Sequence, residues 1–183
     1  MAGIGHNSGR GEMAGRSWRT HVWRKARADL MPTLPIEVVR RRVARAKELG
    51  LPYKTYAGLR AASGDDLIGF MFSSNALRVL RAGQRVPSDR VSKLMTLKEA
   101  RTLALAHAPV QPDQLSPPTD SACKAPRPFA GWGETRAVLL DALTAAQAKP
   151  SRMVLVCDTA LEAEWVAAAK LAGSLPSDVF FAR

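Results

Sequence analysis

The sequence predicts an α/β fold: a small, partly parallel sheet flanked by helices, preceded by a basic helical N-terminal section and a flexible N-terminal arm. Met153–Cys157 (MVLVC) is a continuous apolar run of strand length, typical of a strand that is covered on both faces. A second short apolar run, Asp66–Phe72, is bounded by turn-forming residues, and segments with helical spacing surround both runs. With 183 residues, 46% of them hydrophobic, the chain is long enough to bury a core without disulfides or metal.

The N-terminal section begins with residues that favour a flexible arm and continues with helical patterns. Residues 1–17 hold five glycines and few large apolar side chains, which predicts the arm. Residues 17–30 mix tryptophan, valine and leucine with four basic residues, as in an amphipathic helix with a basic face. The next helix is expected between Pro35, a favoured first position, and Gly50, a favoured stop, and Tyr53–Ser63 predicts a shorter one.

The middle of the chain is harder to assign. We expect Asp66–Phe72 to be a buried strand, followed by a helix over Asn75–Arg81 and by one or two helices within residues 90–107. Residues 109–128 contain six of the chain's twelve prolines. Because proline removes a backbone donor and disfavours both helix and central strand, this stretch is predicted to be a linker or a surface loop.

The last third alternates between helical and strand patterns. Glu134–Ala148 predicts a helix, Met153–Cys157 a strand, residues 161–172 a helix that Gly173 ends, and Asp178–Ala182 a final strand. Together they predict a parallel pair with a right-handed crossover. The expected organisation is an arm at 1–17, a basic helical section with one strand at 18–108, a proline-rich linker or loop at 109–128, and a helix–strand–helix–strand unit at 129–183 that packs with 18–108 as one domain.

Positive charge is concentrated in the first part of the chain. Residues 1–108 carry 20 basic and 8 acidic side chains, whereas residues 109–183 carry 7 and 8, so the net charge of +11 comes from the first part. Such asymmetry is typical of proteins that bind polyanions. The sequence therefore favours a non-enzymatic nucleic-acid-binding or nucleoid-associated accessory protein, with an acidic protein as the alternative partner. The residues expected to contact phosphates are Arg19, Arg24, Lys25, Arg27, Arg40, Arg41 and Arg45.

Polar residues follow two apolar runs and suggest an alternative function. If both runs are parallel strands, these residues lie at carboxyl ends, where open α/β sheets bind ligands. The chain would then be a small enzyme or ligand-binding domain for an anionic metabolite or nucleotide. The purely structural alternative is helix capping, because Thr159 and Glu162 have the spacing of a capping box. The candidate ligand-binding residues are Ser73, Ser74, Asn75, Asp158 and Thr159.

A short segment resembles part of a known DNA-binding family. Ala82–Ser88 (AGQRVPS), followed by Val91 and Leu94, is similar to the closing stretch of phage-repressor-type helix-turn-helix domains, in which such a loop follows the recognition helix. The resemblance covers about twenty residues. The segment between Gly64 and Gly83 is longer than the usual two-helix spacing, so the chain is not assigned to that family.

Motifs for catalysis and metal binding are missing from the sequence. It has no Walker loop and no Gly-x-Ser-x-Gly turn, and its three histidines are far apart, so no catalytic residue, metal or cofactor is predicted. Trp132 is expected to dock the end of the proline-rich stretch onto the core. Two cysteines that are expected to be unpaired, and the lack of a long apolar run, predict a cytoplasmic protein away from membranes.

Overall fold

The computed structural model describes residues 34–182 of the chain. The chain divides into two compact units, Met1–Val39 and Arg40–Arg183, and the sheet and the candidate site belong to the second. The predicted flexible arm and the predicted helix at residues 17–30 lie outside the described residues. None of the helices in the described part of the chain combines the length and the apolar run that a bilayer crossing requires.

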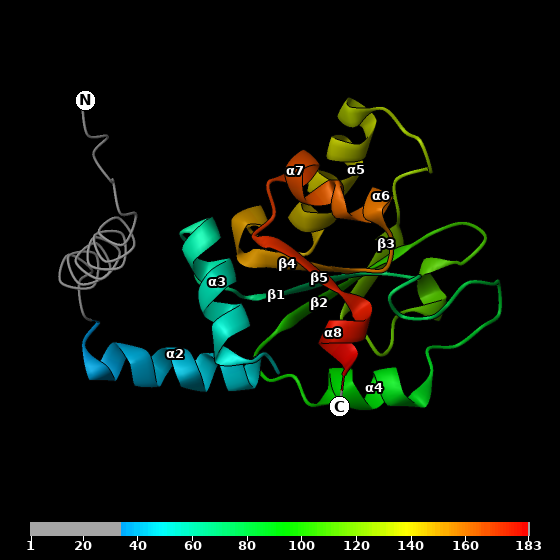
Figure 1. Ribbon diagram of the computed structural model, residues 1–183. Helices are drawn as coiled ribbons and strands as arrows, with labels where there is room; N and C mark the ends of the chain where they lie inside the picture. The colour runs from blue at the N-terminus through cyan, green and yellow to red at the C-terminus, as the bar shows by residue number, and fades with distance from the viewer. Residues whose placement is uncertain (1–33, 183) are drawn as a thin grey trace, which may run out of the picture. The chain divides into compact units, whose positions relative to one another are not determined.

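The core of the second unit is a five-stranded sheet in which every neighbouring pair of strands is parallel (Figure 1). This confirms the predicted α/β fold with helices flanking a sheet, and the sheet, which was expected to be partly parallel, is parallel throughout. The order of the strands across the sheet is β3-β2-β1-β4-β5. Their bounds are β1 Gly69–Ser73, β2 Arg101–Ala106, β3 Ser121–Lys124, β4 Met153–Cys157 and β5 Gly173–Pro176.

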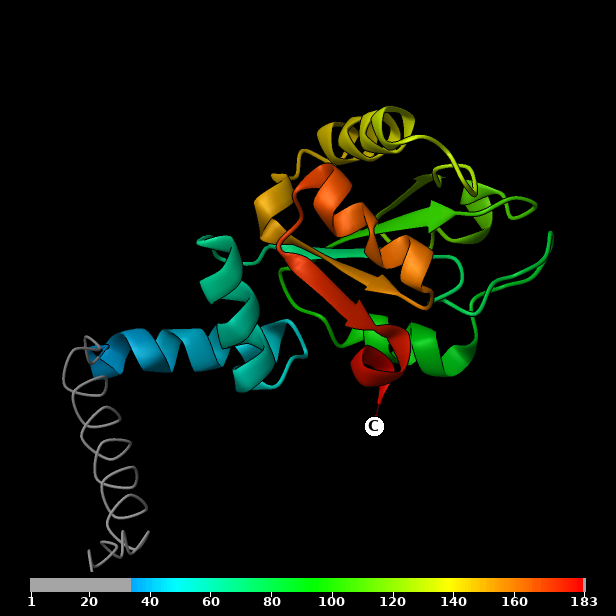
Figure 2. The ribbon, with the colours of Figure 1, turned by 45° about the horizontal axis from the view of Figure 1, so that its top comes forward.

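Helices cover both faces of the sheet. Figure 2 shows α5, α6 and α7 on one side of it and α4 and α8 on the other. The α-helices are α2 Ile36–Glu48, α3 Tyr53–Ser63, α4 Ser88–Met95, α5 Trp132–Ala145, α6 Ala160–Ala163, α7 Trp165–Ala169 and α8 Ser177–Phe181. Two short 3₁₀ turns, Pro112–Gln114 and Pro150–Arg152, precede β3 and β4.

The two faces of β1 explain how one strand supports two hydrophobic clusters. Successive side chains of a strand point to opposite faces, so Phe70 and Phe72 face one layer and Met71 faces the other. Phe70 and Phe72 pack with Tyr56 of α3 and Phe180 of α8. All five residues of β1 are buried, as expected for a central parallel strand.

One predicted helix of the middle segment is wrong, and the helical prediction for residues 90–107 holds only for the first part of that range, in α4. The stretch Asn75–Arg81 forms turns, with Arg78 at a positive φ of 57°. Within residues 90–107, the end of α4 is followed by strand β2, whose sequence RTLALA contains residues that favour helices. Pairing with β1 and burial of all but its first residue override that preference. Without a helix before the loop at 82–87, the described residues contain no helix-turn-helix at this point.

The proline-rich stretch and the C-terminus also differ from prediction. Residues 109–128 include β3, an edge strand whose four residues lie between the prolines and pair with β2. The segment Asp178–Ala182, predicted to be a strand, belongs to α8 instead. Its Phe180 ring packs edge-on against Phe70 and Phe72, with centroid distances of 4.8 and 5.4 Å, and this contact outweighs the β-preference of aromatic residues. The last strand is β5, just before it.

Candidate functional site

The strand order reverses beside β1. From β1 the chain proceeds to β2 and β3 on one side, and then crosses to β4 and β5 on the other. Since all five strands are parallel, their carboxyl ends lie at the same edge, and the switch point is between β1 and β4. Open α/β sheets bind ligands outside the carboxyl ends at this place. The residues that follow the strand ends here are therefore the first candidates for a site.

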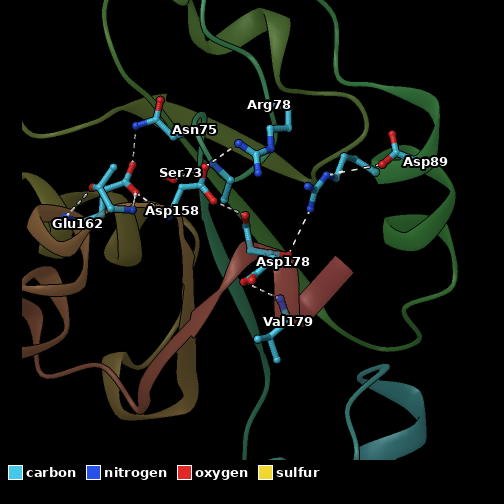
Figure 3. Close-up of polar contacts among 12 residues, drawn as sticks. Ser73, Asn75, Arg78, Asp89, Asp158, Glu162, Asp178 and Val179 are labelled. Atoms are coloured by element: carbon cyan, nitrogen blue, oxygen red, sulfur yellow. Dashed lines mark hydrogen bonds and ion pairs between the residues drawn. The ribbon is translucent and has the colours of Figure 1, made fainter. Parts of the chain in front are cut away.

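Glu162 of α6 lies at the centre of the polar contacts at this edge. Its side chain is 2% exposed and accepts hydrogen bonds from several surrounding groups. The Oε2 atom accepts the backbone N–H groups of Asp158 and Thr159, at 2.8 and 3.0 Å. The Oε1 atom accepts the Nδ2 group of Asn75 at 3.0 Å, drawn in Figure 3, and contacts Nε2 of His107 at 2.9 Å. One carboxylate thus joins the loops that follow β1, β2 and β4.

These contacts keep Glu162 ionised. Burial raises the pKa of its carboxyl group, but hydrogen bonds from His107, the Asp158 backbone, the Ser73 hydroxyl and the Thr159 backbone outweigh that effect and lower the pKa to about 2. The Thr159 hydroxyl in turn accepts the backbone N–H of Glu162 at 3.2 Å, so the predicted capping box is present. Glu162 is both a helix cap and a fixed negative charge.

His107, the first residue after β2, is held from three directions. Its backbone N–H donates to the Ser74 hydroxyl at 3.2 Å. Its ring contacts Glu162 and lies beside Trp165, with ring centroids 5.4 Å apart and ring planes 33° apart. The position of the imidazole is therefore set before any ligand arrives, as an efficient binding site requires.

A cavity of about 440 Å³ opens over these residues. This volume is within the range of small-molecule sites, which are mostly apolar with a few convergent polar groups. Trp132 was expected to dock on the core, but it begins α5 and is 59% exposed. Phe129 is 90% exposed. The aromatic and polar residues of its lining include Asn75, His107, Phe129, Trp132, Glu162 and Trp165.

The structure brings the five sequence-predicted ligand residues to the ends of β1 and β4 but gives them different roles. Asn75 and Thr159 line the cavity. Ser73 and Ser74 are fully buried, and both hydroxyls accept backbone N–H groups. Asp158 does not line this cavity; its carboxylate accepts Arg78 at 2.9 Å and the Ser177 hydroxyl, and Figure 3 shows its contact with Arg78. The contacts of Ser74 and Asp158 are structural, and Ser73 also hydrogen-bonds Glu162.

Sequence patterns do not mark His107 and Trp165 as site residues, and they indicate Glu162 only as a capping partner. His107 follows a segment that was predicted to be helical, so nothing linked it to the strand ends. Reading RTLALA as a strand would have placed His107 at the same edge as Asn75. Phe129 and Trp132 belong to no sequence motif. Their role depends on the loop before α5, which brings them to the cavity.

The basic residues predicted to contact phosphates are only partly described. Arg40 and Arg41 are exposed on α2. Arg45 is largely buried, and its guanidinium group donates to the Glu48 carboxylate at 2.9 Å and to the backbone carbonyls of Leu67 and Glu99 at 3.2 Å. Arg45 therefore connects α2 to the sheet. The other basic residues that the sequence predicts to contact phosphates lie outside the described residues; they are Arg19, Arg24, Lys25 and Arg27.

Thiol and metal chemistry find little support in the described residues. Cys123 and Cys157 are both free. Burial raises the pKa of each thiol to about 11, so both stay protonated at neutral pH and are poor nucleophiles. Within residues 34–182, no group of three or more histidine, cysteine, aspartate or glutamate side chains is placed to hold a metal ion.

No protein-family model, curated protein or solved structure matches the chain. The function has to be inferred from the residues at the switch point and from the distribution of charge. Of these, the switch point offers the more specific geometry, because its polar groups converge on one cavity.

Proposed function

We propose that the second unit binds a small molecule with a planar polar ring, such as the base of a nucleotide, in the cavity at the carboxyl ends of β1, β2 and β4. The observation that carries this proposal is the cavity of about 440 Å³ at the switch point, with Asn75 and the Glu162–His107 pair in its lining. Aromatic residues beside these polar groups favour a flat ring, because they can stack on it.

The charges of the lining favour an uncharged ring in the cavity. Its charged residues are Glu162, Glu164 and Arg127, and Arg127 already donates to the Glu134 carboxylate at 2.8 and 3.0 Å. The backbone N–H groups of Asp158 and Thr159, which could have held a phosphate, donate to Glu162. For a nucleotide, the base would therefore occupy the interior, and the phosphate would extend out of the cavity into solvent.

The test is a calorimetric titration with AMP, GMP, CMP and UMP. We expect at least one of them to bind, and expect Trp132→Ala to weaken that binding about 10-fold, because stacking on an aromatic side chain contributes about 1–3 kcal/mol per base. Tyr53→Ala is the matched control, since Tyr53 is a partly exposed aromatic residue that does not line the cavity. If none of the four nucleotides binds, or if both variants bind like the wild type, the proposal is wrong.

Nucleic-acid binding is the second candidate, and the charge distribution favours it. The net charge of residues 1–108 is far above that of the remainder, and Arg40 and Arg41 are exposed on α2. An accessory protein of nucleic acids or of the nucleoid would use such residues to contact phosphates, with little dependence on base sequence. Two free cysteines suit a reducing compartment, so we place the protein in the cytoplasm in either case.

A salt titration on duplex DNA and on RNA tests this second candidate. The logarithm of the binding constant should fall linearly with the logarithm of salt concentration, and Arg41→Gln should reduce the slope by about 1, the contribution of one phosphate contact. The control is Lys124→Gln, an exposed change in the part of the chain that lacks excess positive charge. Weak binding that does not respond to salt would reject the candidate.

A further inference from the structure

The hydrogen bonds of Glu162 determine which atoms of its neighbours are left for a ligand. An ionised carboxylate only accepts hydrogen bonds, so both groups in contact with Oε1 must be donors. Asn75 therefore directs its Nδ2 group at Glu162, and its Oδ1 atom points elsewhere, as Figure 3 shows. In the same way, His107 donates through Nε2, and its neutral form then carries a lone pair on Nδ1.

These two acceptor atoms have no donor within the described part of the protein and are not fully buried. Within residues 34–182, no side chain or backbone group donates to Oδ1 of Asn75 or to Nδ1 of His107. Two buried side-chain atoms in these residues lack a hydrogen-bond partner, the Nε atoms of Arg42 and Arg90. Neither Oδ1 of Asn75 nor Nδ1 of His107 is among them. Both residues line the cavity.

We infer that Asn75 and His107 select a ring with two neighbouring hydrogen-bond donors, which among the nucleobases is guanine, with Glu162 as the positioning residue for both. This inference rests on the proposed function and narrows its ligand class. Guanine carries a ring N–H at N1 next to an amino group at N2. Adenine and cytosine place an amino group beside a ring acceptor, and uracil has one ring N–H between two carbonyl oxygens.

The discrimination has a clear physical cause. A ligand that lacks one donor leaves a desolvated acceptor without a partner, at a cost of about 1–3 kcal/mol, and a ring acceptor would in addition be repelled by Nδ1 or Oδ1. Because Oε1 of Glu162 accepts from both Asn75 and His107, and the His107 ring lies against Trp165, neither side chain can turn to offer a donor without losing a bond to Glu162. The site therefore favours one hydrogen-bonding pattern.

The test uses the unaltered protein and four probes. GMP should bind most tightly, IMP, which lacks the N2 amino group, about 10-fold more weakly, and N1-methyl-GMP and AMP about 100-fold more weakly. If AMP or N1-methyl-GMP binds as well as GMP, and this binding depends on Trp132, the inference is wrong and the proposed function stands. If none of the probes binds, both fall together.

A second measurement examines the inference without any ligand. Nitrogen-15 NMR of the free protein should show that the neutral His107 ring carries its proton on Nε2. Glu162→Gln should weaken this preference, because a neutral amide attracts the Nε2 proton less than a carboxylate does. A proton on Nδ1 in the wild type would overturn the inference, whatever the nucleotides do.

Discussion

Replacing Gly69 by alanine is expected to lower the free energy of unfolding by about 3 kcal/mol or more, at the upper end of overpacking effects. Gly69 begins β1 and pairs with Arg101, the first residue of β2. A Cβ atom at Gly69 would overlap the carbonyl oxygen of Arg101 and would lie 2.8 Å from its carbonyl carbon and its nitrogen. Those atoms are backbone, so the strands have to separate where the central pair of the sheet begins.

Gly58→Ala is the matched control for this experiment. Gly58 lies within α3, and a Cβ atom there would meet nothing within 4 Å. Alanine is the better helix former, so this change should stabilise the protein by about 0.5–1 kcal/mol. Urea unfolding of the two variants should therefore give shifts of opposite sign. A Gly69→Ala variant as stable as the wild type would contradict the close approach of β1 and β2.

The second large effect is expected for Glu162→Gln, which should cost about 3 kcal/mol at pH 7. Glutamine retains the shape of glutamate, but its amide nitrogen is a donor. It would face either the backbone N–H groups of Asp158 and Thr159 or the donors of Asn75 and His107. Two buried donors would then oppose each other, so the loops after β1, β2 and β4 would lose their common acceptor.

The effect of this substitution should depend on pH. The pKa of Glu162 falls from its ordinary 4.5 to about 2 in the fold, so its ionised form stabilises the protein at any pH above about 4.5. This contribution is lost as the pH falls toward 2 and the folded protein takes up the proton. At about 1.4 kcal/mol per unit, the depressed pKa corresponds to about 3 kcal/mol.

Urea unfolding at pH 7 and at pH 2.5 measures this. The difference in stability between the wild type and Glu162→Gln should be large at pH 7 and should shrink at pH 2.5. Glu164→Gln, an exposed change two residues away, is the control and should change stability little at pH 7. If the difference between the wild type and Glu162→Gln were equal at both pH values, the ionised carboxylate would not be what connects the three loops.

The parts of the fold that the sequence predicted are those where local pattern and tertiary role agree. Met153–Cys157 is apolar throughout and is a central strand. The spacing of Thr159 and Glu162 predicts a capping box, and the structure contains it. The prediction that Asn75 and Thr159 lie at neighbouring strand ends has two conditions. Asp66–Phe72 must contain a strand, and that strand must be parallel to Met153–Cys157; both conditions hold.

The remaining elements were missed where tertiary contacts override local preference. The leucines and alanines of β2 favour a helix, and only their pairing with β1 makes them a strand. Strand β3 lies among prolines, which an edge strand tolerates. His107 can be recognised as a site residue only once β2 is known. Trp132 can be recognised only once the path of the preceding loop is known, because that loop brings it to the cavity.

The central claim, that the cavity at the switch point is the binding site, is tested most directly by backbone amide NMR during a titration with GMP. The largest shifts are predicted at the residues that line the cavity, among them Asn75, His107 and Glu162. The exposed residues of α2 should remain unchanged. Shifts that concentrate on α2 and leave Asn75 and His107 unmoved would contradict the claim.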